Sequence, residues 1–441
     1  MERQQDYVMR TVEERGVRYV QLWFTDVLGT PKAFSITPAE LENALDEGMT
    51  FDGSAIDGFS RVQESDVLAK PDPKTFQILP YGTDEDPVAR VVCDIINLDG
   101  SPFQGDPRNV LRRTLEKARE QGFSFYAAPE IEYFYFAADD DPEPLDRGSY
   151  FELTASDITS RLRKETVLTI EEMGIPVEYA QHEDSPSQHE IDLRHTDGLT
   201  MADTVMSVRL VVKELAQKAG VYATFMPKPI AGMQGSGMHT HFSLFEGDSN
   251  AFHDPGDEHG LSKVAKGFIA GLLHHAPEIT AVTNQWVNSY KRLVVGFEAP
   301  VYVSWARNNR SVIVNVPHSK RGKAESTRIE FRSPDPACNP YLAFSLVLAA
   351  GLKGIEERYE LPPEAGTNLY ALTPEELLAE GIEPLPGNLH EAIEAMERSE
   401  LVAETLGEHV FEFFIRNKRA EWLDYKTQVS QFEIDRYLPR L

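Results

Sequence analysis

The sequence predicts an α+β protein in which a small N-terminal domain of mixed structure precedes a large domain built from a sheet and helices. The chain has 441 residues, of which 41% are hydrophobic and 26% charged, enough for a large core divided between two or three domains. Strand signals and a helix signal share the first hundred residues. Seven further strand signals alternate with helical stretches in the rest of the chain.

The N-terminal domain is expected to open with an apolar strand and to end just before a strongly signalled helix. Its predicted elements are strands at 19–24, 32–35 and 88–98 and a helix at 37–48. Thr37 and Glu40 fit a capping box at the start of that helix, and Gly48 fits its end. Asp106 then begins another helix, so we expect the domain boundary just before it. The predicted domains are residues 1–103 and 104–441.

The large domain is expected to combine a sheet with buried and amphipathic helices. Its strand signals lie at 124–136, 177–181, 188–194, 222–226, 237–245, 311–316 and 327–332. The apolar run from Tyr341 to Leu352 predicts a buried helix, and residues 386–425 have the pattern of amphipathic helices.

Charge and cysteine content exclude several classes of protein. The 43 basic and 71 acidic residues give a formal net charge of -28, which opposes binding to nucleic acid or anionic membranes. The longest apolar run is shorter than the roughly 20 residues that span a bilayer. The N-terminus has no secretion signal, and two cysteines, Cys93 and Cys338, fit a reducing compartment. We therefore expect a cytoplasmic protein.

Three predicted strands alternate polar and apolar residues, and each has a charged face. Because successive side chains of a strand point to opposite faces, the polar members of each segment share one face. These sets are Glu130 with Glu132, His239 with His241 and Ser243, and Arg328 with Glu330 and Arg332. Buried carboxylates are costly unless they are paired or bind a metal. The pattern therefore predicts a cavity that holds cations and an anionic ligand.

Two more carboxylates, Glu183 and Glu190, flank a turn favoured by Pro186 and could face each other. Oxygen ligands with a single imidazole suit Mg²⁺ or Mn²⁺ better than Zn²⁺. Taken alone, a glutamate of this kind is more often a solvated strand position, but six candidates in polar-faced contexts favour the metal site.

A glycine-rich segment and several arginines could bind the anionic ligand. Residues 232–239 contain enough glycine for a ligand to approach the backbone closely. A guanidinium binds carboxylate or phosphate with two hydrogen bonds, which makes the arginines candidate anion clamps, although each could also be a surface ion pair. These arginines are Arg292, Arg310, Arg328 and Arg332.

Six segments, spread over nearly the whole chain in order, together resemble bacterial type I glutamine synthetase. They are Phe51-Asp52-Gly53-Ser54, Pro129-Glu130-Ile131-Glu132, Phe225-Met226-Pro227-Lys228-Pro229, Gly235-Ser236-Gly237-Met238-His239, Asn288-Ser289-Tyr290-Lys291-Arg292 and Asn339-Pro340-Tyr341-Leu342. The chain resembles the short, non-adenylylated form, so we expect no adenylylation at Tyr370. Arg61 resembles an arginine of glutamine feedback in this form, although a loop ion pair is an equal alternative.

The resemblance implies a β-grasp-like N-terminal domain followed by a catalytic ATP and glutamate domain with an antiparallel sheet and helices. It implies an ATP-dependent ligase of nitrogen metabolism that joins ammonia to the γ-carboxylate of L-glutamate through γ-glutamyl phosphate. Mg²⁺ or Mn²⁺ would be the cofactor, two or more per site, with ATP as co-substrate. The implied assembly is a dodecamer of two hexameric rings with active sites between subunits.

The resemblance also assigns roles to individual residues. One metal would be held by Glu130, His239 and Glu330, and the other by Glu132, Glu183 and Glu190. The residues implied for glutamate binding are Gln234, Gly235, Arg292, Glu298, Arg310 and Arg332. Those implied for ATP binding are Glu178, His241, Ser243, Arg310, Asn315 and Arg328. The implied catalytic residues are Asp52, which reaches a neighbouring subunit's site, the flap carboxylate Glu298, and Arg310.

Two positions depart from the family pattern, in which Asn commonly stands at Gln234 and Arg at Asn315. The C-terminal part of the chain also resembles actinobacterial paralogues, some of which attach polyamines, so a γ-glutamyl-polyamine or other amine ligase is the alternative. Two further alternatives are an inactive binding or scaffold protein, which would bind nucleotide without glutamate-dependent hydrolysis, and a two-metal phosphohydrolase.

Overall fold

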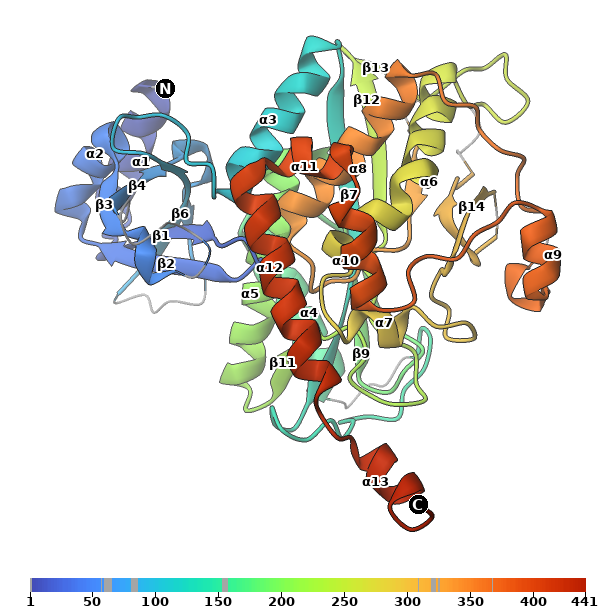
Figure 1. Ribbon diagram of the computed structural model, residues 1–441. Coiled ribbons are helices and arrows are strands. Elements are labelled where there is room, and N and C mark those ends of the chain that lie inside the picture. The colour runs from blue at the N-terminus through green and yellow to red at the C-terminus, as the bar shows by residue number, and fades with distance from the viewer. Residues whose placement is uncertain are drawn as a thin grey trace.

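The computed structural model has a small N-terminal domain beside a large domain that contains most of the chain (Figure 1). It describes residues 2–56, 58, 66–80, 86–152, 158–307, 309–318, 323, 326–366 and 368–441. Arg61 lies outside the described residues. Of the helices in this described part of the chain, none is long and apolar enough to cross a bilayer.

The N-terminal domain is a sheet with two helices packed on it, as expected of a β-grasp domain. The strand order is β2-β1-β6-β4-β3, with β5 beside β6, and β1 and β6 are parallel in a sheet that is otherwise antiparallel. The strands are β1 (Tyr19–Thr25), β2 (Pro31–Ile36), β3 (Met49–Asp52), β4 (Asp66–Pro71), β5 (Gln77–Ile78) and β6 (Val88–Ile96). Helices α1 (Glu2–Glu14) and α2 (Pro38–Glu47) share one hydrophobic core with the sheet.

The predicted capping box at the start of α2 is wrong, although the helix and its end at Gly48 are where the sequence places them. The Thr37 side chain makes no cap hydrogen bond. Instead the backbone N–H of Glu40 donates to the carbonyl oxygen of Thr37 at 3.0 Å. Pro38 at the first helical position already fixes a helical φ, so the helix can begin without a side-chain cap.

The large domain is built on a second sheet, with strand order β14-β15-β16-β12-β7-β9-β8. Neighbouring strands are antiparallel except for the parallel pair β14 and β15. These strands are β7 (Ser124–Phe136), β8 (Val177–His182), β9 (Gln188–Leu193), β12 (Thr240–Glu246), β14 (Tyr302–Ala306), β15 (Val312–Asn315) and β16 (Ile329–Phe331). Short strands β10 (Thr196–Asp197) and β11 (Tyr222–Thr224) pair with β7, and β13 (Ser249–Asn250) pairs with β12.

One face of this sheet is covered by helices. Helices α3, α5 and α6 contact its strands, and α8 packs against all three of them. These helices are α3 (Pro107–Glu120), α5 (Gly198–Lys218), α6 (Lys263–Thr283) and α8 (Pro340–Glu356). The apolar side chains of the alternating strands point into this core, as in the edge-to-face contact of Phe242 with Phe344, whose ring centroids are 5.6 Å apart. The polar residues between them therefore face the opposite side, as the period of two predicts.

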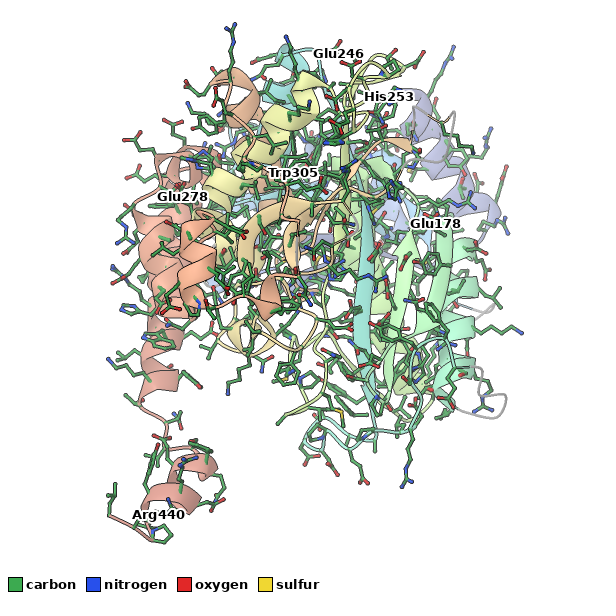
Figure 2. All side chains as sticks on the ribbon, turned by 90° about the vertical axis from the view of Figure 1, so that its right-hand side faces the viewer. Glu178, Glu246, His253, Glu278, Trp305 and Arg440 are labelled. Carbon is green, nitrogen blue, oxygen red and sulfur yellow. The ribbon has the colours of Figure 1, made fainter. Side chains whose placement is uncertain are left out.

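Of the remaining helices, α4 precedes β8 and the others follow residue 288. They are α4 (Ile158–Glu172), α7 (Ser289–Arg292), α9 (Pro374–Ala379), α10 (Leu389–Glu397), α11 (Glu400–Leu406), α12 (Glu408–Lys426) and α13 (Gln431–Tyr437). The last helix extends away from the body of the domain in both views, with Arg440 at its far end (Figures 1 and 2).

The two domains are joined by a buried arginine at the start of α3. Arg108 pairs with Asp94 at 2.5 Å and Asp72 at 3.0 Å in the N-terminal domain, and with Asp203 of α5 at 2.9 Å. Because Arg108 is 3% exposed, these three carboxylates must compensate for the loss of hydration of its positive charge.

Candidate active site

A cavity of about 390 Å³ lies on the face of the large sheet that the helices leave uncovered. Strands β7, β8, β9, β12, β15 and β16 contribute to its wall, together with the segment before β12, helix α7 and the loop that follows it. The cavity brings together most of the residues that the sequence predicts for the site. They are Glu130, Glu132, Glu183, Glu190, Gln234, Gly235, His239, His241, Arg292, Glu298, Arg310, Asn315, Glu330 and Arg332.

The first predicted metal cluster is assembled by three neighbouring segments of the sheet. His239 Nδ1 lies 3.3 Å from Glu130 Oε2 and 3.8 Å from Glu330 Oε1. The backbone N–H of Glu130 donates to the carbonyl of His239 at 2.8 Å, which fixes the two strands in register. The ligand atoms of these three residues lie within 4.8 Å of one another, so one ion could contact all three.

Histidines keep Glu130 ionised inside this cluster. Burial raises the pKa of Glu130, but hydrogen bonds from His239 and His241 outweigh burial, and the net pKa lies below its usual value. His241 Nε2 is 2.6 Å from Glu130 Oε1. Burial lowers the pKa of His239, which favours the neutral imidazole that a metal requires.

The second predicted cluster contains three carboxylates held by amide side chains. Gln181 Nε2 donates to Glu183 Oε1 at 2.7 Å and to Glu190 Oε2 at 2.8 Å. Gln188 Nε2 donates to Glu132 Oε2 at 2.9 Å. The turn between β8 and β9 and the cross-strand pairing of Glu132 with Glu190 bring these groups together, as the sequence predicts.

Burial and mutual repulsion make this second cluster reluctant to ionise. Burial and the charge of Glu183 raise the pKa of Glu132 to about 8. Burial, together with the hydrogen bond and charge of Glu190, raises the pKa of Glu183 to about 9. Burial also raises the pKa of Glu190. Such a group of carboxylates needs positive charge close by if it is to be ionised at neutral pH.

The donor set of the two clusters fits hard divalent cations. It consists of five carboxylates and one imidazole, which suits Mg²⁺ or Mn²⁺ rather than the multiple nitrogen or sulfur ligands that Zn²⁺ prefers. The carboxylates are almost fully buried, at 5–7% exposure for Glu132, Glu183, Glu190 and Glu330. A cation would remove the repulsion that raises the pKa values in the second cluster.

The arginines of the cavity differ in how free they are to bind an anion. Arg292 donates to the carbonyls of Ser333 at 2.8 Å and Arg332 at 3.1 Å, so the backbone holds its two terminal nitrogens. Arg332 Nη1 donates to Glu330 Oε1 at 2.5 Å. Arg310 also lines the cavity and is largely exposed to it.

The backbone at Gly235 lies very close to the backbone at Pro227. A Cβ atom built there would lie 2.3 Å from the carbonyl oxygen of Pro227, so only glycine fits this position. The neighbouring Gln234 lines the cavity, and its carbonyl accepts a hydrogen bond from Ser185 Oγ at 3.2 Å. Within the part of the chain that the structure describes, Gln234 Oε1 is buried and has no hydrogen-bond partner.

The flap residue Glu298 adopts a left-handed conformation with φ of 54°, which is uncommon outside glycine. Its Oε2 accepts a hydrogen bond from the hydroxyl of Tyr150 at 2.7 Å. Beside it, Lys228 Nζ lies 3.7 Å from the ring centroid of Phe297. Glu298 and its neighbour Phe297 are therefore each held by a side chain from a different part of the chain.

Four predicted residues do not line this cavity. Arg328 touches it indirectly, because its Nε donates to His241 Nδ1 at 3.2 Å. Ser243 follows His241 by two residues on the same face of β12. Glu178 is exposed at an irregularity in the register of β8, at the edge of the sheet (Figure 2). Asp52 ends β3 in the N-terminal domain, where it accepts a hydrogen bond from the N–H of Ser54 at 2.9 Å.

The structure adds residues in and beside the cavity that the sequence argument missed. Asp192 could join Glu130 and Glu190, since ligand atoms of all three lie within 4.8 Å. Burial and the charge of Glu130 raise the pKa of Asp192 to about 7. The sequence could have indicated Asp192, because it follows Glu190 by two residues and so lies on the same strand face. Among the residues that line the cavity, those missed include Tyr150, Tyr179, Gln181 and Gln188.

Two family models match the chain almost end to end. The model described as "Glutamine synthetase, beta-Grasp domain" matches residues 16–98, and the one described as "Glutamine synthetase, catalytic domain" matches residues 104–437. A glutamine synthetase of Mycolicibacterium smegmatis is 55% identical over 444 residues, covering 99% of this chain and 100% of the relative. One of Thermotoga maritima is 47% identical over 435 residues, covering 98% of each.

Solved structures are also similar to this chain over nearly its whole length. A structure described as "GmaS/ADP complex-Conformation 1" is 32% identical with a TM-score of 0.88, covering 98% of this chain and 99% of that one. A cryo-EM structure of Plasmodium falciparum glutamine synthetase has a TM-score of 0.90 at 24% identity and covers 98% of both chains, so it supports the fold alone.

Proposed function

The chain belongs to the glutamine synthetase family, and from this premise we propose how its cavity carries out ATP-dependent synthesis of glutamine from glutamate and ammonia. The observation that supports the proposal most strongly is the pairing of two acidic clusters in one cavity beside arginines. Enzymes of the glutamine synthetase family use ATP and a divalent metal. The full-length similarity to named glutamine synthetases favours this activity over an amine ligase, an inactive scaffold and a phosphohydrolase.

We assign the six residues of the two clusters to two divalent cations, either Mg²⁺ or Mn²⁺. The first ion would be held by Glu130, His239 and Glu330, and the second by Glu132, Glu183 and Glu190. When bound, such ions neutralise the charge that develops on phosphate oxygens during phosphoryl transfer. Asp192 would support both clusters, because its carboxylate lies beside Glu130 of the first and Glu190 of the second.

The chain's other side chains would position the two substrates. A carboxylate is a poor electrophile, so the γ-carboxylate oxygen of glutamate first attacks the γ-phosphorus of ATP, and ADP leaves. Arg310 and Arg332 are assigned to the transferred phosphoryl group and Arg292, Gln234 and Gly235 to glutamate. Glu178, His241, Ser243 and Arg328 are assigned to ATP. His241 and Ser243 share a face of β12, Arg328 donates to His241, and Glu178 lies on β8.

The second step replaces phosphate by nitrogen. Ammonia attacks the carbonyl carbon of γ-glutamyl phosphate, phosphate leaves, and the surplus proton passes to a carboxylate. We assign Glu298 to this role, with Asp52 of a neighbouring subunit helping to bind and deprotonate ammonium. A closed flap would also exclude water, which would otherwise hydrolyse the acyl phosphate without product.

The proposal also covers the domain boundary, the assembly and the location of the protein. We place the domain boundary between residues 103 and 104. We propose a dodecamer of two hexameric rings, because Asp52 is in the N-terminal domain and lies outside its own chain's cavity. We also propose a cytoplasmic location, which fits the two cysteines being unpaired and buried.

The test is turnover with one acceptor at a time. Purified protein would receive ATP, glutamate and Mg²⁺ or Mn²⁺, with ammonium, methylamine, ethanolamine or putrescine as the acceptor. We expect glutamine and phosphate in equal amounts with ammonium, and little product with the other amines. Faster turnover with putrescine than with ammonium at low concentration would overturn the proposed acceptor. Phosphate release without any amine product would overturn the ligase.

A further inference from the structure

Asn315 lies directly opposite Glu330 in the sheet. It is the last residue of β15 and pairs with Glu330 of the antiparallel strand β16. Its side-chain Nδ2 donates to Glu330 Oε2 at 2.6 Å. This geometry identifies the amide end that faces Glu330 as the nitrogen, because an amide oxygen at this distance would repel the carboxylate.

The two oxygens of Glu330 are held from different sides. Arg332 Nη1 donates to Oε1 at 2.5 Å, while Asn315 donates to Oε2. His239 Nδ1 lies 3.8 Å from Oε1. Glu330 is 5% exposed, so water contributes little to its orientation. The orientation of the Glu330 carboxylate relative to His239 therefore depends on the hydrogen bonds from Arg332 and Asn315.

The other end of the Asn315 amide is unsuited to a phosphate. Among the described residues, Asn315 Oδ1 is buried and has no hydrogen-bond partner. An amide oxygen can only accept hydrogen bonds, and the oxygens of a nucleotide's phosphates at neutral pH also only accept. The amide oxygen that Asn315 leaves unpaired therefore offers a nucleotide phosphate no hydrogen bond, and one of the two N–H donors of Nδ2 is already directed at Glu330.

We propose that Asn315 is a positioning residue that holds the Glu330 carboxylate in the orientation needed for the first cation, and that it does not bind ATP. This inference rests on the proposed cation site. It replaces the role in ATP binding that the resemblance implies for Asn315.

The experiment compares Asn315→Leu, Glu330→Gln and the double variant in their binding of Mn²⁺ without ATP or glutamate. Leucine has a similar size but no donor. Titration calorimetry on the full-length protein should show one class of Mn²⁺ sites weakened roughly 10- to 100-fold in Asn315→Leu, as is usual when a group that orients a metal ligand is removed. In the Glu330→Gln background, Asn315→Leu should change Mn²⁺ affinity by less than about threefold, since its target is gone.

A second measurement separates this role from nucleotide binding. At saturating Mn²⁺, the KM for ATP of Asn315→Leu should stay within about threefold of the wild type, while the Mn²⁺ dependence of turnover shifts. Ser304→Ala is a matched control, because it removes a hydrogen bond from the adjacent strand β14 outside the cavity and should leave Mn²⁺ binding unchanged. If the leucine variant does not fold, Asn315→Ala removes the same donor with less bulk.

Unchanged Mn²⁺ affinity with a raised KM for ATP would overturn the inference. Equal loss of Mn²⁺ affinity in the wild-type and Glu330→Gln backgrounds would also overturn it. These results are distinct from failure of the proposed function, because binding is measured without turnover. A wild-type protein that binds Mn²⁺ in the cavity but makes no glutamine would overturn the proposed function and leave the role of Asn315 standing.

Discussion

The hydroxyl of Tyr150 donates a hydrogen bond to Glu298 Oε2, with 2.7 Å between the two oxygens. This bond joins the loop that follows β7 to the flap that follows α7, across the mouth of the cavity. Burial and nearby carboxylates, Glu183 first among them, raise the pKa of Tyr150, so the phenol remains a donor at physiological pH. The flap carboxylate is therefore oriented by a neutral side chain.

Replacing Tyr150 by phenylalanine should loosen the flap without removing the ring. A hydrogen bond to a charged group contributes about 1.5–3 kcal/mol, so we expect glutamine formation to fall by roughly 10- to 100-fold. Phosphate release should fall less than glutamine formation, because water then competes for the acyl phosphate. The measurement is the ratio of glutamine to phosphate. A ratio that stays at one would contradict this role for the hydrogen bond.

Arg108 should be a main determinant of stability at the junction of the domains. Arg108→Met leaves the buried carboxylate of Asp203 uncompensated, which typically costs about 3–5 kcal/mol. Urea denaturation would measure the loss. Arg112→Met is the control, because Arg112 is 46% exposed in its pair with Asp94 and should cost less than about 1 kcal/mol. Similar losses for the two variants would count against a special role for Arg108.

Removal of divalent cations should destabilise the protein more at high pH than at low pH. The pKa values of about 8 for Glu132 and about 9 for Glu183 lie above the usual 4.5, so the folded protein keeps protons that the unfolded chain releases. Their contribution to stability therefore falls as pH rises from about 4.5 toward 9. A bound cation relieves the repulsion between the carboxylates.

The measurement for this pH dependence is the rise in melting temperature caused by Mn²⁺ at pH 6 and at pH 8.5. We expect the larger rise at pH 8.5, together with release of protons when Mn²⁺ binds. Glu183→Gln should reduce the difference between the two pH values. An equal rise at both would show that the second cluster is already ionised without metal.

Gln234 offers a test of substrate positioning. Its side chain lines the cavity one methylene longer than the asparagine common in the family, so Gln234→Asn should change the KM for glutamate, whereas the KM for ATP stays constant. A one-methylene change in a binding site is worth about 1–3 kcal/mol, roughly 10- to 200-fold. Steady-state kinetics would decide, and an altered KM for ATP alone would show that Gln234 contacts the nucleotide instead.

The sequence was most informative where one strand carries both the core and the site. In β7, the buried Ile131 and Tyr133 alternate with Glu130 and Glu132, so a period of two was enough to assign each side chain to a face. The approach of Glu183 to Glu190 was also foreseeable, because a short turn joins their strands.

Features that depend on distant parts of the chain were not predictable in this way. Tyr150 meets Glu298 across 148 positions, and its loop has no periodic pattern that would indicate a partner. The helix α1 was missed because its residues are largely polar and it is stabilised by packing of Val8 and Val12 on the N-terminal sheet. The exposure of Glu178 at the sheet edge also depends on an irregular register in β8 that its sequence does not indicate.

The most direct test of the account is anomalous diffraction from crystals grown with Mn²⁺ and a non-hydrolysable ATP analogue. The account predicts two manganese peaks in the cavity, one contacting Glu130, His239 and Glu330 and the other contacting Glu132, Glu183 and Glu190. A protein that makes glutamine while its manganese lies away from these six side chains would contradict it.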